Sequence, residues 1–430
     1  MKSLTLLFLL VTVAVCHEPF QVKFEWKTIN FDWPSEEMRV YEIDHNGYIP
    51  ENNFISGIKF WKGKMYLSLP RFKDGVPVTL GVTSATPVNH NTAPSLEAYP
   101  NWDMQKLDDC SAFQFVQSME IDPAGRMWVL DSGRVSPLLP EVKITCPPRL
   151  VILDIENNGE ILRNYEFPQH VARRGTAYLN DIVVDHEDGG MAYITDTDRE
   201  DPGLIVYSLQ NNTSWKVRHD SMKAKPEAVR FMINKTPVNV PFAIDGIALS
   251  PASSEDRMVY YSPLSSFHLY SVPTSALKNN ASIDDVVKEV GRKNSQSDGM
   301  VMSATGVLYY GLLADDAVGT WDTEQSQSFN TGKRVISRDH ERMQWPDSFA
   351  IDEDGNVYCV TNQLQNLLNN RVNVSVPNYR VVRSKINVKN YQYYKDGTAP
   401  EQPAISASSA SRINLAIVSG LFVLLAFVAK

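Results

Sequence analysis

The sequence predicts an all-β fold, a six-bladed β-propeller with a central channel. A hairpin pattern recurs along most of the chain: a polar residue, a short apolar strand, a turn that usually carries glycine, and an aromatic-rich strand. The copies follow one another at a similar spacing, and a strand-like run near the N-terminus remains to complete the last sheet. The alternative is a β-sandwich whose hairpins resemble one another by chance.

The clearest copy spans residues 345–364. Ser348–Ile351 and Val357–Thr361 read as extended segments, and Gly355 supplies the positive φ that the turn between them needs. The heads of the six copies lie 61, 63, 64, 53 and 49 residues apart. Such fixed-phase repeats are typical of a propeller in which each repeat supplies one four-stranded blade. The aligned head positions are Gly57, Ser118, Asp181, Asp245, Asp298 and Asp347.

The segments between the repeats are assigned to outer strands and connections. Phe20–Phe31 and Met38–Ile43 both look extended, and one of them is expected to close the ring by joining the last blade. Residues 70–100 are proline-rich and irregular, and connect the first blade to the second. Ser282–Val290 begins with a cap-like serine and is expected to be a short helix. The propeller is expected to occupy residues 17–395 as one domain.

The 430 residues are 43% hydrophobic and carry a formal net charge of −9. The hydrophobic and charged fractions are those of a globular protein and not of a disordered one. Nucleic acid binding needs a clustered basic face, and the sequence has no basic run, so we expect no nucleic acid partner.

Both ends of the chain carry targeting features. Residues 1–16 hold a lysine, an apolar run and small residues at a cleavage position, so they are expected to be a secretory signal peptide. Residues 396–412 form a small, polar spacer before the hydrophobic tail 413–430, which is the pattern of a GPI-attachment signal. The alternative is a single membrane-spanning helix. In both readings the protein is secreted and held at the extracellular face of the plasma membrane by a C-terminal anchor.

Loss of the signal peptide leaves three cysteines, Cys110, Cys146 and Cys359. Cys110 precedes the hairpin of the second repeat and Cys146 follows it, so we expect a disulfide between them. Cys359 lies within a strand and is expected to be a free thiol in the core. The expected glycosylation sites, each in an N-x-S/T sequon, are Asn211, Asn212, Asn234, Asn280 and Asn373.

Six tracts of the chain resemble the insect yellow / major royal jelly protein family, and the resemblance extends over essentially all of the secreted part. They are WVLDSGR (Trp128–Arg134), CPPRLVILDI (Cys146–Ile155), LNDIVVD (Leu179–Asp185), YITDT (Tyr193–Thr197), GIALSP (Gly246–Pro251) and YYSPLSS (Tyr260–Ser266). The resemblance implies a six-bladed propeller and an extracellular protein, but no single function. Some members resemble dopachrome-converting enzymes of melanin and cuticle tanning, others are carriers that bind biogenic amines in the channel, and others are nutritional or pigment-patterning proteins. The hydrophobic tail is not a general feature of the family.

The innermost strands of a propeller line its channel, so the four aligned aspartates are expected to converge at one entrance. Four carboxylates there suit an ammonium ligand, a metal ion, or a carboxyl group whose pKa is raised for base catalysis. Dopachrome conversion needs a positioned base and no cofactor, and Asp245 and Asp298 are the candidate catalytic residues. The alternative is that each aspartate only bonds to nearby backbone N–H groups.

Further candidate ligand-binding residues surround this entrance. The resemblance to amine-binding members places Asn362 against a ligand ammonium, with Asp347 or Ser348 opposite. The departure from that pattern is Leu364, where an aromatic residue would stack better. A calcium ion is a further hypothesis, taken from other six-bladed propellers, but the glutamate ligand those proteins use has no counterpart here, and no metal or other cofactor is expected. The other ligand-binding candidates are Asn180, Asp181, Phe115 and Phe242.

The leading functional hypothesis is an extracellular role in melanin or cuticle pigmentation, through dopachrome-type conversion of a catecholamine or indole derivative. The alternative is a protein that binds biogenic amines in the channel, or interacts with other extracellular molecules, without catalysis. The sequence leaves open whether the protein is an enzyme.

Overall fold

The computed structural model describes residues 19–405, except residues 138–142, 145 and 327. The expected signal peptide (1–16) and hydrophobic tail (413–430) lie outside the described residues. Within the described part of the chain, no helix is both long and apolar enough to cross a lipid bilayer.

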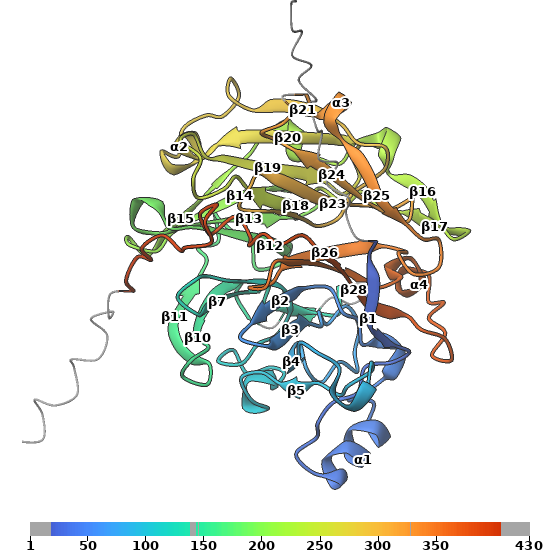
Figure 1. Cartoon of the computed structure of the whole chain (residues 1–430). Coiled ribbons are helices and arrows are strands. Elements are labelled where there is room, and N and C mark those ends of the chain that lie inside the picture. Colours follow the sequence, from blue (N-terminus) through green and yellow to red (C-terminus); the bar gives the residue numbers. More distant parts are fainter. Residues whose placement is uncertain (1–18, 138–142, 145, 327, 406–430) are drawn as a thin grey trace, which may run out of the picture.

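Six four-stranded antiparallel sheets surround a central axis and form a six-bladed β-propeller (Figure 1). The first three blades comprise β2 (Ile58–Trp61), β3 (Lys64–Ser68), β4 (Leu80–Ser84) and β5 (Glu97–Ala98); β6 (Val116–Ile121), β7 (Arg126–Asp131), β10 (Arg149–Asp154) and β11 (Glu160–Glu166); and β12 (Leu179–Asp185), β13 (Met191–Asp196), β14 (Gly203–Ser208) and β15 (Thr213–Val217). The last three blades comprise β18 (Ile244–Leu249), β19 (Met258–Pro263), β20 (His268–Pro273) and β21 (Lys288–Arg292); β22 (Met300–Met302), β23 (Val307–Leu312), β24 (Ala317–Asp322) and β25 (Arg334–Arg338); and β26 (Pro346–Ile351), β27 (Asn356–Thr361), β28 (Tyr379–Lys385) and β1 (Gln21–Trp26). The predicted fold is confirmed, because each repeat supplies the inner hairpin of one blade.

The last blade is closed by the N-terminal strand, as expected. β1 pairs antiparallel with β28, and Trp26 lies opposite Tyr379 in this pairing. Both side chains are buried. The first and last parts of the chain therefore share one sheet, and the ring of blades has no open seam.

The second N-terminal segment expected to be extended is helical, so that prediction is wrong. Met38–Ile43 lies within α1 (Glu36–Asp44). Ser35 caps this helix by accepting a hydrogen bond from the Met38 N–H at 3.2 Å, and Glu36 pairs with Arg39 within the first turn at 2.5 Å. These local bonds favour the helix over the strand that the apolar alternation suggested.

Two further segments differ from the expected structure. Ser282–Val290 is not a helix but bends and then enters β21, the outer strand of the fourth blade. Pairing of β21 with β20 satisfies the backbone groups of this strand, and the tertiary contact outweighs the cap signal of Ser282. Residues 70–100 are more than a connection, because they supply β4 and β5, the two outer strands of the first blade.

Short elements decorate the ends of the blades. Two additional hairpins are formed by β8 (Arg134–Val135) with β9 (Lys143–Ile144) and by β16 (Arg230–Ile233) with β17 (Thr236–Asn239). Further short α-helices are α2 (Thr274–Lys278), α3 (Phe329–Gly332) and α4 (Leu364–Leu368). Short 3₁₀ helices lie at Pro50–Asn52, Val88–His90, Asp103–Gln105, Glu187–Gly189, Asp220–Met222 and Pro226–Ala228. α4 contacts β17, and Figure 1 shows these two elements on the same side of the propeller.

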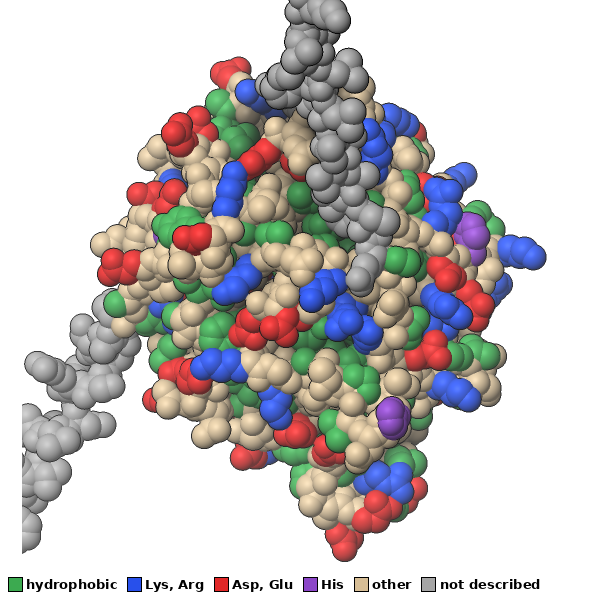
Figure 2. Space-filling view, viewed as in Figure 1, with side chains coloured by type: hydrophobic (Ala, Val, Ile, Leu, Met, Phe, Trp, Pro, Cys, Tyr) green, Lys and Arg blue, Asp and Glu red, His purple; other side chains and the backbone are tan. Residues whose placement is uncertain are grey.

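The predicted cysteine chemistry is confirmed. Cys110 and Cys146 form a disulfide with their Cα atoms 5.4 Å apart, and the loop they close contains the inner hairpin of the second blade. Cys359 is a free, buried thiol in β27. On the surface seen in Figure 2, acidic and basic side chains are interspersed, without a large patch of one sign.

After β28 the chain crosses one end of the channel as an irregular segment, residues 387–405, which we call the C-terminal strap. We call this the lower end of the channel, and the end at which the inner strands begin the upper end. The Tyr391 N–H donates to the Met302 carbonyl (3.0 Å), and the Tyr391 carbonyl accepts from the Ala252 N–H (2.9 Å). Further along, Arg126 donates to the Pro403 carbonyl at 2.5 Å. The packed part of the chain thus continues beyond residue 395, and Figure 1 shows its end, in red, away from α4.

Candidate functional site

Four of the six inner strands have a break in register at the same place. The breaks lie between Val116 and Met119, Leu179 and Ile182, Ile244 and Ile247, and Pro346 and Phe349. Such β-bulges turn a side chain out of the regular alternation of a strand. Each break spans one head position aligned from the sequence: Ser118, Asp181, Asp245 and Asp347, respectively.

All six aligned positions line one cavity at the upper end of the channel. Its volume is only about 10 Å³, which is room for roughly one water molecule. The polar side chains of four inner strands therefore meet almost without free space between them. The lining residues are Ser56, Gly57, Gln117, Ser118, Asn180, Asp181, Asp245, Asp298, Gly299, Asp347 and Ser348.

Asp245 and Asp298 form a buried carboxyl pair in this cavity, and each shifts the pKa of the other. Burial, reinforced by the charge of Asp298, raises the pKa of Asp245 well above its usual range. Burial also raises the pKa of Asp298 to about 6, although the neighbouring Asp245 and a hydrogen bond from Trp345 Nε1 at 2.7 Å lower it. Two adjacent carboxyl groups that cannot both ionise share a proton near neutral pH. This pair places an acid and a base side by side.

Asp347 lies beside the pair and is held by Asn362. Asn362 Nδ2 donates to Asp347 Oδ2 at 2.5 Å and to the Ile55 carbonyl at 2.9 Å. Burial and the charge of Asp298 raise the pKa of Asp347, whereas the bond from Asn362 lowers it. The predicted partners Asp347 and Asn362 are thus brought together, but both are buried and bonded to each other.

Asp181 completes the ring of carboxyl groups. Ser118 Oγ donates to Asp181 Oδ1 at 3.0 Å, and burial raises the pKa of Asp181 against the opposing charge of Lys59. Asn180 also lines the cavity, but its amide donates to Thr197 Oγ1 at 2.9 Å. The predicted residues on this side are therefore present at the channel, with Asn180 engaged by a neighbouring strand.

Two charged residues missed by the sequence reasoning lie below the ring. Lys59 Nζ and Glu120 Oε2 form an ion pair at 3.3 Å, and burial raises the pKa of Glu120. Both residues stand two positions after aligned heads, which is one strand period, so the repeat alignment could have found them. Tyr391 of the strap lies under this pair: its Oη accepts from the Val184 N–H at 2.8 Å and donates to Glu120 at 3.4 Å. These groups close the lower end of the channel.

Aromatic side chains lie over the upper end. Phe115 and Tyr178 pack edge to face with ring centroids 5.9 Å apart, and the Phe72 ring is 5.4 Å from Phe115. Burial, followed by the charge of Asp245, raises the pKa of Tyr178, so this side chain lies within electrostatic reach of the carboxyl ring. Phe242, half-buried, packs against the hydrophobic core cluster that contains Phe115. The expected aromatic walls Phe115 and Phe242 do not line the small cavity themselves, and Tyr178 is an addition that no sequence motif signalled.

Within the described residues, no group of three or more His, Cys, Asp or Glu side chains is arranged to hold a metal ion. The oxygen atoms of the ring are instead bonded to protein donors, namely Ser118, Trp345 and Asn362.

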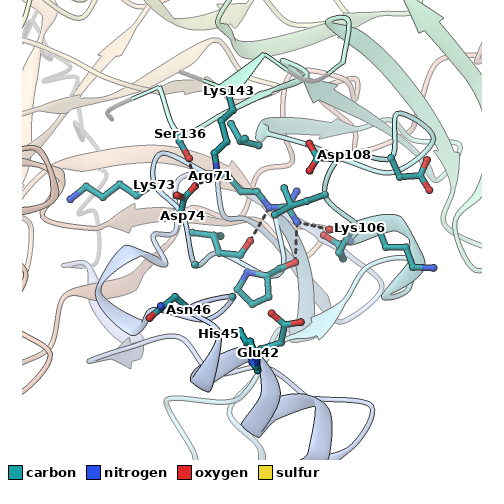
Figure 3. A pocket seen from close by; sticks show the side chains of 18 of the residues that line it. Glu42, His45, Asn46, Arg71, Lys73, Asp74, Lys106, Asp108, Ser136 and Lys143 are labelled. Atoms are coloured by element: carbon teal, nitrogen blue, oxygen red, sulfur yellow. Dashed lines mark hydrogen bonds and ion pairs between the residues drawn. The ribbon is translucent and has the colours of Figure 1, made fainter. Parts of the chain in front are cut away.

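A second, larger cavity of about 690 Å³ lies between α1 and loops of the first two blades (Figure 3). Side chains of both charges line it, and its cations already have partners. Arg71 donates its five N–H groups to five backbone carbonyls at 2.6–2.9 Å. Lys73, Lys106 and Lys143 each bond an oxygen atom 2.6–3.1 Å away. The carboxyl pair of the channel has no counterpart in this cavity, so we take the channel as the candidate site.

The five sequon asparagines, Asn211, Asn212, Asn234, Asn280 and Asn373, are exposed. Exposure is what a glycosylated asparagine requires, and glycosylation itself stays a prediction.

Comparison with known proteins finds related sequences over most of the chain. The family model for Major royal jelly protein matches residues 114–392. The chain is 29% identical over 387 residues to Major royal jelly protein 1 from Apis mellifera, covering 84% of this chain and 86% of that protein. It is 27% identical over 386 residues to Dopaminechrome tautomerase from Drosophila melanogaster (85% and 82% covered) and 28% identical over 397 residues to Protein yellow from the same species (88% and 71%).

Solved structures with a related arrangement have much lower sequence identity. A luciferin-regenerating enzyme matches with a TM-score of 0.47 and 13% identity, covering 83% of this chain and 99% of the other. A regucalcin from Agrobacterium tumefaciens matches with a TM-score of 0.47 and 12% identity, covering 83% and 96%.

Proposed function

Because the chain belongs to the major royal jelly protein family, we propose that it is a secreted pigmentation protein that converts a catecholamine-derived aminochrome at the upper end of its channel. Relatives named Protein yellow and Dopaminechrome tautomerase support this choice among the activities of the family. The observation that carries the proposal is the buried carboxyl pair Asp245–Asp298.

The proposed reaction is an isomerisation and needs no oxidant or reductant. A base removes a proton from a ring carbon of the aminochrome, the C–H electron pair moves into the ring, and a quinone oxygen gains a proton. General acid–base catalysis of this kind is most effective when the pKa of the group lies near the working pH. Asp298, with its pKa raised to about 6, is suited to act as the general base, and the protonated Asp245 beside it is suited to act as the general acid.

The surrounding residues have supporting roles in this proposal. Phe115, Tyr178 and Phe242 supply apolar faces for the indole-like ring. Asn362, by bonding Asp347, keeps that carboxyl group from turning towards the pair. Asn180, Asp181 and Ser348 provide further polar groups for the substrate oxygen and nitrogen atoms.

The test is the decolourisation of dopaminechrome by the purified protein. Wild type should accelerate it above the blank, and Asp298→Asn and Asp245→Asn should each lose about 10²–10⁴-fold of that acceleration. Asp284→Asn, at an exposed position, is the control. A wild-type rate equal to that of the blank would reject the proposal that the protein is an enzyme.

A second candidate function is the binding of a biogenic amine without catalysis. Four carboxyl groups converge in the channel, and the nearby Lys59 is already paired with Glu120, so a ligand ammonium would relieve the repulsion among the four. Titration calorimetry with dopamine and serotonin should then give saturable binding that is lost in Asp347→Ala and Asn362→Ala. Flat heats with the wild-type protein would exclude this function.

We also propose that the protein is held at the extracellular face of the plasma membrane by its C-terminal tail. Treatment of expressing cells with a phospholipase that cleaves GPI should release it. Retention on the membrane after this treatment would favour a membrane-spanning helix.

A further inference from the structure

The two ends of the channel are covered to different extents and by segments that are attached differently. At the lower end, the backbone of the strap bonds to the backbones of two blades through Tyr391, and the Tyr391 ring reaches Glu120. The Gln392 amide adds a bond of 2.8 Å to the Ile121 carbonyl. This end is fixed by main-chain hydrogen bonds to two blades and by a side-chain bond to a third.

The upper end is covered in part by the β16–β17 hairpin, which is attached differently. Its two strands form a sheet of their own, separate from the sheets of the six blades. Alternate side chains face inward, so that Phe231, Ile233 and Val238 are buried against the protein, whereas Met232 is 52% exposed. A two-stranded hairpin is at best marginally stable alone, so its position depends on this packing.

The hairpin is connected to the carboxyl pair by a short series of contacts. The Phe231 ring lies 6.1 Å from the Trp345 ring, and Trp345 Nε1 donates to Asp298 at 2.7 Å. Trp345 has a φ of +50°, a conformation that a bulky residue adopts only under restraint from its surroundings. On the far side, Thr236 Oγ1 and Asn366 Oδ1 of α4 approach to 3.4 Å, and Asn369 Nδ2 donates to the Pro237 carbonyl at 2.9 Å.

We propose that the β16–β17 hairpin is a gate over the upper end of the channel, with α4 as the surface on which it closes and Trp345 as the contact that links it to Asp298. The cavity at the carboxyl pair holds roughly one water molecule, so a ring-sized molecule reaches Asp245 and Asp298 only after part of the structure moves. A hairpin held by side-chain packing opens at a lower free-energy cost than a strap held by main-chain hydrogen bonds. The movement of the hairpin is inferred from the structure alone, and only the identity of the molecule that it admits rests on the proposed function.

A reversible lock tests the gate. In Thr236→Cys/Asn366→Cys, a disulfide would fix the hairpin to α4, because the two side chains are in direct contact. Access is measured with a water-soluble carbodiimide and an amine, reagents that are too large for the closed cavity and that modify carboxyl groups. Peptide mass spectrometry then gives the labelling rates of Asp245 and Asp298, with the exposed Asp284 as internal standard.

The oxidised double variant should label Asp245 and Asp298 at least tenfold more slowly than the same protein after mild reduction, while Asp284 labels equally in both. The single variants and reduced wild type control for the lost sequon at Asn234 and for reduction of the native disulfide. Equal rates in the locked and reduced forms would overturn the gate, and so would complete protection of the pair in wild type.

Dopaminechrome turnover is followed in parallel. Gated labelling without turnover would reject the proposed enzyme function and keep the gate. Turnover that persists in the locked protein would reject the gate alone.

Discussion

The pKa of Asp298 results from opposing influences, one of which can be removed by substitution. Burial raises it, and the neighbouring Asp245 and the hydrogen bond from Trp345 limit the rise. If ionised Asp298 is the base, the rate rises with pH through about 6 as this group loses its proton. Trp345→Phe removes a hydrogen bond to the ionised Asp298 carboxylate, and such a bond is worth about 1.5–3 kcal/mol. The pKa of Asp298 therefore rises, and the ascending limb of the pH–rate profile moves to higher pH by about one unit or more.

The measurement for Trp345→Phe is kcat/KM for dopaminechrome as a function of pH. Trp102→Phe is the matched control, because this partly buried indole donates to the Asp32 carbonyl at 3.2 Å instead of to a channel carboxyl group. An ascending limb at the same pH in Trp345→Phe and wild type would contradict the assigned role of Trp345.

Lys293 is a buried lysine whose protonation affects the stability of the fold. Its Nζ donates to Ser262 Oγ and to the His268 carbonyl (3.1 Å), both neutral acceptors, and burial lowers its pKa to about 7. The unfolded chain keeps a proton on this lysine up to about pH 10.4. Between these two pH values the unfolded state binds more protons than the folded state, so the free energy of unfolding rises with pH. Below about pH 7 Lys293 is charged in the folded state too, and the full cost of burying its charge lowers the stability.

Lys293→Met should therefore be more stable than wild type by about 1–4 kcal/mol near pH 7, with the difference shrinking as the pH approaches 10. Urea unfolding at several pH values measures it, and Lys288→Met, at an exposed position of β21, serves as control. A constant difference across the pH range would show that Lys293 folds without losing its proton.

At the residue scale, the alignment of repeats was enough to predict which side chains meet. Asp181, Asp245, Asp298 and Asp347 all line the cavity because the inner strands begin around one axis, although the register breaks place Asp245 and Asp347 level with Asn180, one residue before Asp181. The hydrogen bonds between them were not predictable. Whether Asn362 faces a ligand or Asp347 depends on side-chain distances that no spacing in the sequence encodes.

At the scale of elements, the inner hairpins were predictable because each combines a two-residue apolar period with a turn. The irregular positions were not. The bulge at Asp245 leaves the sequence pattern of β18 unchanged and is visible only in its pairing with β19. The errors at Met38–Ile43 and Ser282–Val290 have a common cause, since short segments are decided by capping bonds or by tertiary pairing more than by their apolar pattern.

The β1 strand closes the ring of blades through buried aromatic side chains. Phe24 is fully buried in this strand and stacks on Trp26 with ring centroids 5.5 Å apart. Phe24→Ala should lower the free energy of unfolding by about 3–5 kcal/mol, because it leaves a cavity in the sheet that closes the ring. Denaturant unfolding measures this change, and Gln21→Ala at the exposed start of the strand should have little effect. Equal stability of the two variants would mean that ring closure does not depend on this packing.

At the scale of the whole molecule, six blades and one C-terminal strap determine how dry the channel is. The sequence predicted the number of blades, because the repeats are local and similar. It did not predict that the chain after the last blade returns under the channel, because the strap belongs to no repeat and its contacts join positions as far apart as Glu120 and Tyr391. The closure of the lower end is therefore a property of the complete fold.

This closure can be tested through the groups that it keeps from water. Burial is the main cause of the raised pKa of Glu120, and Tyr391 Oη contacts this carboxyl group from below. Tyr391→Ala should admit water to the lower channel and move the pKa of Glu120 down towards the ordinary range, because hydration favours the charged carboxylate. Infrared titration of the protonated carboxyl band in the folded protein measures the change. Tyr394→Ala, at a strap residue that is 37% exposed, should leave the titration as in wild type. If the band titrates identically in Tyr391→Ala and wild type, the blades alone keep the channel dry and the strap does not seal it.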